Sequence, residues 1–167
     1  MPFKSAGRLL DRLAALLDPL QPLFALATRW YVSWQFLKSG WLKVSNWPAT
    51  IDLFTNEYHV PLLPPQAAAV SGAFGELFFS ALLVIGLGGR VGPLGLFAVN
   101  LMAVISYRQV LLAEGFEAAL AQHLLWGYML ATLAVYGLGT LSADRLLKIP
   151  ADAQSTADLS ITRSNRT

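Results

Sequence analysis

The chain has 167 residues, of which 55% are hydrophobic and only 13% are charged. Because a soluble domain carries about 25% charged residues, this composition predicts an integral membrane protein. The net charge of +2 is too small to indicate a nucleic-acid partner. The sequence contains no cysteine, which excludes disulfides, dithiol chemistry and iron–sulfur clusters for this chain acting alone.

Residues 1–21 predict an amphipathic helix that lies on the membrane surface. Its cations and leucines recur at helical spacing: Lys4, Arg8 and Arg12, with Leu9, Leu10, Leu13, Leu16, Leu17 and Leu20. A secretory signal peptide is the competing interpretation, because Ala25-Leu26-Ala27 is similar to a cleavage site. Polar residues and prolines at 18–22 interrupt the apolar run that a signal peptide needs.

Residues 22–44 predict the first membrane-spanning helix, since ~20 mostly apolar residues at ~1.5 Å each cross a bilayer. At ~100° per residue, one face of this helix is small, polar and charged. That face consists of Arg29, Ser33, Phe36, Gly40 and Lys43. A charge at bilayer depth is costly, so we expect Arg29 to face protein or water and to have a partner. Lys38 lies on the opposite side and is expected to extend toward the lipid headgroups.

Residues 45–63 predict a polar and aromatic loop on the outer side of the membrane. The aromatic residues near its membrane edge are Trp41, Trp47, Phe54 and Tyr58, and its ionisable residues are Asp52, Glu57 and His59. This loop is longer than the other connections, and long ordered loops are often functional. A simple cap on the helices is the alternative.

Three further spanning helices are predicted over residues 65–87, 91–112 and 119–141. Pro64-Pro65 opens the first of them, where proline is tolerated in the initial turn. The polar residues inside these helices include Glu76, Asn100 and His123. Residues 149–167 are polar and predict a disordered cytoplasmic tail.

Together the segments predict an all-α fold, an integral membrane four-helix bundle over residues 22–148. Basic residues concentrate on the cytoplasmic side of membrane proteins. If both termini are cytoplasmic, most lysines and arginines lie on that side: Lys4, Arg8, Arg12, Arg90, Arg145, Lys148, Arg163 and Arg166. We therefore predict that both termini are cytoplasmic.

The polar residues at bilayer depth predict a buried cluster. Counting ~1.5 Å per residue from the cytoplasmic helix ends places Arg29 at ~10 Å, Glu76 at ~16 Å and Asn100 at ~14 Å. We therefore expect an Arg29–Glu76 ion pair, with Asn100 as a candidate third member. Such a pair either fixes only the helix register or handles protons or a ligand.

A second candidate site lies at the outer mouth of the bundle. Lys43 shares the face of Arg29 and could meet His123, Glu57 or Asp52 there. His123 is a candidate proton carrier or hydrogen-bonding partner for a quinone carbonyl, and the alternative is a histidine at the wet interface. A metal site built from His59, His123, Asp52 and Glu57 is possible in principle, but no ligand spacing marks it. With only two histidines and no phosphate-binding glycine motif, neither haem nor a nucleotide is expected.

Three short motifs occur in an informative order. The face from Arg29 to Lys43 is similar to the pattern R-x3-G-x2-F-x3-G-x2-K, with Ser33 in place of the usual glycine. The second motif consists of Glu76, Gly86-Leu87 and Arg90, and the third of Gly137-Leu138-Gly139 with Leu141-Ser142-Ala143-Asp144. In this order, over about residues 22–148, they resemble the DoxX family of small four-helix bacterial membrane proteins. Many members have an acidic residue where this chain has His123.

The resemblance implies a multi-pass protein of the bacterial inner membrane. Family members are linked to quinol oxidation and to complexes that resist oxidative stress, and a subgroup with a similar outer loop is associated with metal stress. We therefore expect a subunit of a membrane redox system that interacts with quinone. The alternatives are a non-catalytic membrane partner or chaperone and a small transporter gated by Arg29 and Glu76. Besides the lipid bilayer, a protein partner or a homo-oligomer is expected from the small size.

Overall fold

The computed structural model describes residues 14–147, and this part of the chain is helical with no β-strand. Its elements are η1 (Asp18–Leu20), α2 (Gln21–Ser45), α3 (Trp47–Asn56), α4 (Pro65–Ile85), α5 (Val91–Ser106), α6 (Arg108–Leu111), α7 (Glu117–Tyr136) and α8 (Ala143–Leu146). Most of the expected surface helix over 1–21, and the whole tail over 149–167, lie outside the described residues. Both therefore stay predictions.

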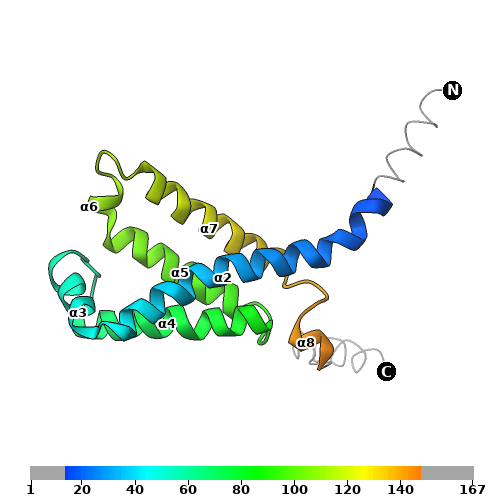
Figure 1. The fold of residues 1–167 in the computed structure, drawn as a ribbon, viewed down its shortest axis with the longest axis horizontal. Coiled ribbons are helices and arrows are strands. Elements are labelled where there is room, and N and C mark those ends of the chain that lie inside the picture. Colours follow the sequence, from blue (N-terminus) through cyan, green and yellow to red (C-terminus); the bar gives the residue numbers. More distant parts are fainter. Residues whose placement is uncertain (1–13, 148–167) are drawn as a thin grey trace, which may run out of the picture.

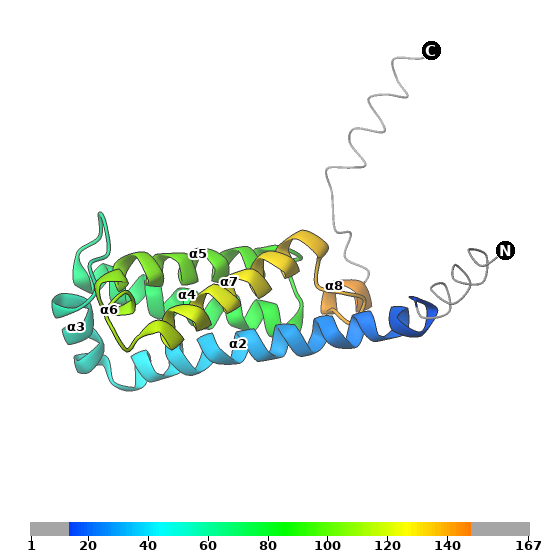
Figure 2. The same cartoon turned by 90° about the horizontal axis from the view of Figure 1, so that it is seen from above.

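The long helices α2, α4, α5 and α7 run side by side (Figures 1 and 2). Helix α2 packs on α4, α4 on α5 and α5 on α7, while α7 returns to contact α2. The short helices α3 and α6 lie at one end, and η1 and α8 lie at the other (Figure 2). This arrangement places the two ends of the described chain on the same side of the molecule.

Local sequence signals explain where the helices begin and end. Pro65 occupies the first turn of α4, where its missing N–H costs nothing. The same helix ends at Gly86, which adopts the left-handed conformation (φ 76°) that glycine reaches without strain. Asn46 caps α3 because its side-chain oxygen accepts a hydrogen bond from the backbone N–H of Ala49 at 3.4 Å.

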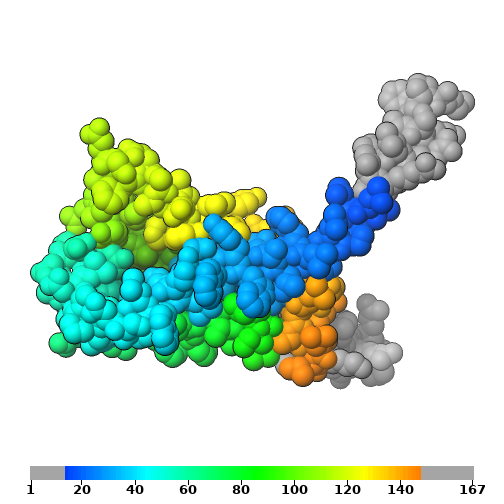
Figure 3. All heavy atoms as spheres, in the orientation of Figure 1, coloured from blue at the N-terminus to red at the C-terminus, as the bar shows by residue number. Residues whose placement is uncertain are grey.

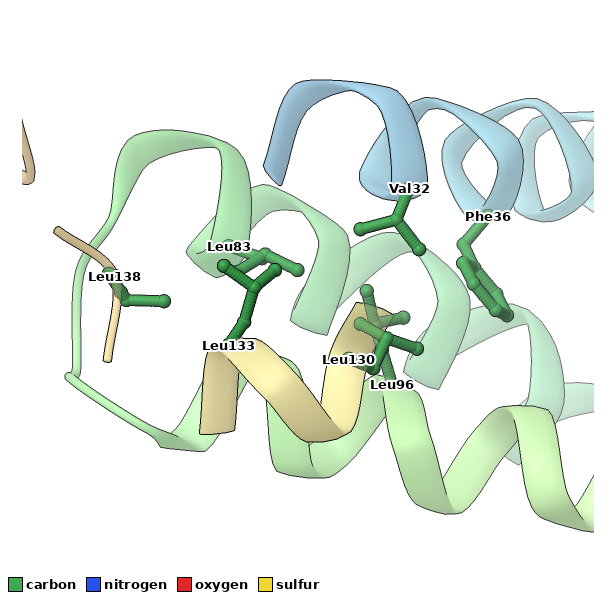
Figure 4. Close-up of a cluster of buried hydrophobic side chains, with 7 residues drawn as sticks. All are labelled: Val32, Phe36, Leu83, Leu96, Leu130, Leu133 and Leu138. Carbon is green, nitrogen blue, oxygen red and sulfur yellow. The ribbon is translucent and has the colours of Figure 1, made fainter. Parts of the chain in front are cut away.

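The main apolar core lies where the long helices meet (Figure 4). Its buried side chains come from all four long helices and from the segment after α7: Val32, Phe36, Leu83, Leu96, Leu130, Leu133 and Leu138. Glycines let the helices approach closely, as they do in membrane proteins. A Cβ added at Gly40 of α2 would lie 2.8 Å from Leu77 Cγ of α4. The close packing of the Gly40 backbone against the Leu77 side chain therefore fixes the position of α2 on α4.

The outer segment differs from the sequence prediction, since residues 47–56 form helix α3 rather than a loop. The reason is a displacement of α2 along α4. Gly40, five residues before the end of α2, lies level with Glu76, eleven residues after the start of α4. The first turns of α4 therefore extend past α2 by about 9 Å. Helix α3 covers them through a second core cluster of Phe54, Ala68 and Ala69.

Two of the described helices, α4 and α7, are long and apolar enough to cross a membrane, and α5 is apolar but shorter. Helix α5 is shorter than the predicted third helix because the chain turns at Tyr107 and continues as α6. Helix α2 is longer than the others but carries three cations, Arg29, Lys38 and Lys43. Two of these cations, Arg29 and Lys43, are buried, and their surroundings form the candidate site.

Candidate functional site

Arg29 is the most deeply buried charged residue of the described chain, with 1% of its surface exposed. Among residues 14–147, its guanidinium donates only to backbone oxygens: Leu83 at 3.0 Å, Val84 at 2.8 Å, Leu138 at 3.2 Å and Leu141 at 2.8 Å. The first two carbonyls lie in the last turn of α4, where they have no partner within the helix. Arg29 therefore ties the end of α4 to the segment that follows α7.

The surroundings of Arg29 match this clamping role. A Cβ at Gly86 would lie 2.5 Å from Arg29 Nη2, so only glycine fits beside the guanidinium. The carboxylate of Asp144 accepts hydrogen bonds from the backbone N–H groups of Gly88 and Gly89 at 3.1 and 2.6 Å. The same two chain segments are thus joined twice, by a cation and by an anion.

The predicted Arg29–Glu76 ion pair is wrong, and Asn100 does not join these two residues. The predicted depths place Glu76 near Arg29 only if the start of α2 and the end of α4 lie at the same level. Arg29 lies eight residues into α2 but contacts Leu83, only two residues from the end of α4. The first turns of α2 thus extend past α4, as Figure 3 shows for the blue end of α2. Because of this offset of six residues, about 9 Å, Glu76 lies beside a different cation of α2.

That cation is Lys43. Its ammonium donates to both carboxylate oxygens of Glu76, each at 2.8 Å, and to the hydroxyl of Ser39 at 2.8 Å. Ser39 in turn donates to Glu76 Oε1 at 3.2 Å. Lys43 and Glu76 are 9% and 7% exposed. The predicted helix face is confirmed, because Arg29, Ser33, Phe36, Gly40 and Lys43 are all buried.

Asn100 and His123 form a separate pair between α5 and α7. Asn100 Nδ2 donates to the backbone oxygen of His123 at 2.9 Å, and its Oδ1 lies 2.8 Å from His123 Nδ1. An amide oxygen only accepts, so His123 carries its proton on Nδ1. The imidazole also packs edge-on against Trp126 at 5.1 Å. His123 therefore does not meet Lys43, contrary to one of the sequence expectations.

Asp52 and Glu57 also stay apart from Lys43. Asp52 is exposed and accepts a hydrogen bond from Asn56 within α3. Glu57 accepts a hydrogen bond from the hydroxyl of Tyr107 at 2.8 Å, and this bond is the first cause of a raised Tyr107 pKa. Lys43 lies one layer deeper, facing α4.

A cavity of about 330 Å³ opens between α3, the segment after it, α4 and α5. Its walls are mostly apolar and include Phe54, Val60, Leu63, Phe79, Val99 and Met102. Its polar lining residues include Lys43, Tyr58, Glu76 and Ser106. Apolar walls with a few convergent polar groups are typical of a small-molecule site. Of the predicted site residues, Lys43 and Glu76 line this cavity, whereas Arg29, Asp52, Glu57, Asn100 and His123 do not.

Two polar residues of the cavity were missed from the sequence. Tyr58 was identified only as an interfacial aromatic residue, although burial, and then the charge of Glu76, raise its pKa to about 12. Ser106 has a buried hydroxyl with no hydrogen-bond partner among residues 14–147. A single serine in an apolar helix gives no signal of its own, so the sequence does not identify Ser106 as a residue of the cavity.

Comparison with known proteins gives one match. A family model described as DoxX matches residues 24–109, which is about half of the chain. The match includes the face from Arg29 to Lys43, Glu76 and every residue that lines the cavity. It is shorter than the resemblance over about 22–148 that the motifs indicated. No curated protein and no solved structure matches the chain.

Proposed function

The chain belongs to the DoxX family and is a membrane protein, and we propose that it binds a quinone or quinol as a subunit of a membrane redox system. The observation that carries the proposal is the apolar cavity that ends on the Lys43–Glu76 ion pair. A flat lipophilic ring fits apolar walls, and its polar substituents need the few polar groups at the end. Because the chain has no cysteine, it supplies the binding site in this proposal, and a partner protein accepts electrons from a bound quinol or donates them to a bound quinone.

We propose further that α2, α4, α5 and α7 form a four-helix bundle across the bacterial inner membrane, with both termini cytoplasmic. The even number of long helices and the common location of η1 and α8 support this topology (Figure 2). The outward-facing tryptophans of α2 and the apolar surfaces of α4 and α7 then contact lipid or a partner. In this orientation the cavity opens near the outer face, beneath α3.

The binding role can be tested with a variant whose larger side chain fills the cavity. Ala103 lines it, so Ala103→Phe occupies the space that a ring would take. Ala121 is exposed on α7 and does not line it, so Ala121→Phe is the matched control. Each protein is purified in mild detergent, and its bound quinones are extracted and quantified. We expect quinone with the wild type and the control and its loss from Ala103→Phe; equal amounts in all three would refute the proposal.

A second candidate function, a non-catalytic partner that recruits or stabilises another protein, is favoured by the outer surface of α2. Trp30, Trp34 and Trp41 project from one side of this helix and are 55%, 56% and 68% exposed. Tryptophan is enriched in binding surfaces as well as at membrane interfaces. Co-purification of a partner that is lost on Trp34→Ala, with no bound quinone in the wild type, would favour this function. The transporter alternative required an Arg29–Glu76 gate, and that pair does not exist.

A further inference from the structure

The hydrogen bonds of Lys43 determine what the cavity can offer to a ligand. An ammonium group has three N–H donors. Those of Lys43 are directed to Ser39 Oγ, Glu76 Oε1 and Glu76 Oε2, each at 2.8 Å. Although Lys43 lines the cavity, it has no donor left for a ligand carbonyl. Its role is to hold and neutralise the carboxylate of Glu76.

Glu76 has the opposite property. An ionised carboxylate offers about four acceptor positions. Lys43 occupies two of them and Ser39 a third. Glu76 also lines the cavity, and 7% of its surface is exposed. One acceptor position of a charged group is thus available at the polar end of the cavity.

Ser106 supplies an independent observation from the facing helix, α5. Its side chain lines the cavity and is 1% exposed, yet its hydroxyl has no partner in the described part of the chain. A buried hydroxyl without a hydrogen bond is costly. A ligand with two polar oxygens could donate an O–H to Glu76 through one of them and form a hydrogen bond with Ser106 through the other.

From this arrangement we infer that the cavity selects a neutral lipophilic molecule with a phenolic O–H, and therefore a hydroquinone over the corresponding quinone. The inference rests on the proposed quinone or quinol site and adds its preference. Tyr58 and Ser106 could donate to a quinone carbonyl, but hydrogen bonds to an ionised acceptor are roughly twice as strong as bonds between neutral groups. Only the reduced molecule can donate to Glu76.

Three probes with the same ring and decyl tail separate these contributions: a 1,4-hydroquinone, its 1,4-benzoquinone and its dimethyl ether. The ether keeps the oxygens but has no O–H. Binding is measured by calorimetry with the full chain in detergent under argon. We expect the hydroquinone to bind at least about tenfold more tightly than the other two, since one charge-assisted hydrogen bond is at stake.

Variants assign the preference to Glu76. Glu76→Gln keeps the shape but replaces one acceptor with an N–H donor, so the preference for hydroquinone should fall to about threefold or less. Glu114→Gln, which changes an exposed carboxylate outside the cavity, should leave it unchanged. If Glu76→Gln does not fold, the relative affinities of the three probes for the wild type still test the preference for the hydroquinone. Equal binding of the three would overturn the inference alone, whereas binding of none would overturn the proposed function as well.

Discussion

Replacing Arg29 tests whether its cluster is structural. Arg29→Met keeps the apolar stem but leaves four backbone oxygens without their donor, those of Leu83, Val84, Leu138 and Leu141. A buried carbonyl that is left without its donor costs roughly 1–3 kcal/mol. Adding ~1.5–3 kcal/mol for each bond would overstate the loss, because the four bonds share one desolvated cation. We expect the variant to lose about 3–5 kcal/mol of unfolding free energy.

The assay is reversible unfolding in mixed micelles with increasing dodecyl sulfate, followed by tryptophan fluorescence. Lys38→Met is the matched control, because Lys38 is an exposed cation on the same helix and should change stability by less than ~0.5 kcal/mol. Arg29→Lys should fall between the two, since lysine has three donors for four acceptors. Wild-type stability in Arg29→Met, combined with loss of ligand binding, would show that Arg29 acts on a ligand instead.

Three further predictions follow from local contacts. Gly86→Ala should unfold more easily than Gly89→Ala in the same micelle assay, because both need positive φ but only the former adds a Cβ against Arg29; equal losses would contradict the clamp. Since burial and then Glu76 raise the pKa of Tyr58 to about 12, above ~10 for a free tyrosine, its contribution to stability should be lost as the pH rises from about 10 to 12. In an absorbance titration, the difference between the wild type and Tyr58→Phe should show a tyrosinate step near pH 12, and a difference step near pH 10 would refute the assignment. Because the chain has no cysteine, Asn56→Cys on α3 and Thr140→Cys beside α8 report topology: an impermeant maleimide should label only Asn56→Cys in intact cells, and the reverse would invert the proposed orientation.

The periodicity of α2 could be predicted from the sequence because it depends only on the helix itself. The face from Arg29 to Lys43 is buried as predicted. The partners of that face could not be predicted, because they depend on how far α2 is displaced along α4. An offset of about six residues moved Glu76 from Arg29 to Lys43. Such an offset is set by the close contact at Gly40, which a single sequence does not reveal.

The sequence contains a helix-start signal for α3, although the polar composition of this segment favoured a loop. Asn46 followed by Pro48 is typical of a helix start, and Phe54 lies where it can pack on Gly72. The cavity itself had no local signal. Its lining comes from segments around Lys43, Tyr58, Glu76 and Ser106, which only the packing of α2, α3, α4 and α5 brings together.

The most direct test of the central claim is photo-crosslinking in native membranes. A decyl hydroquinone with a diazirine near the ring is activated in membranes that contain the protein, and labelled peptides are mapped by mass spectrometry. The cavity predicts label within residues 54–63, 68–79 and 95–106, suppressed by excess unlabelled hydroquinone and by Ala103→Phe. Label spread over the outward faces of α2 and α7, and unaffected by competitor, would contradict a ligand site at the Lys43–Glu76 pair.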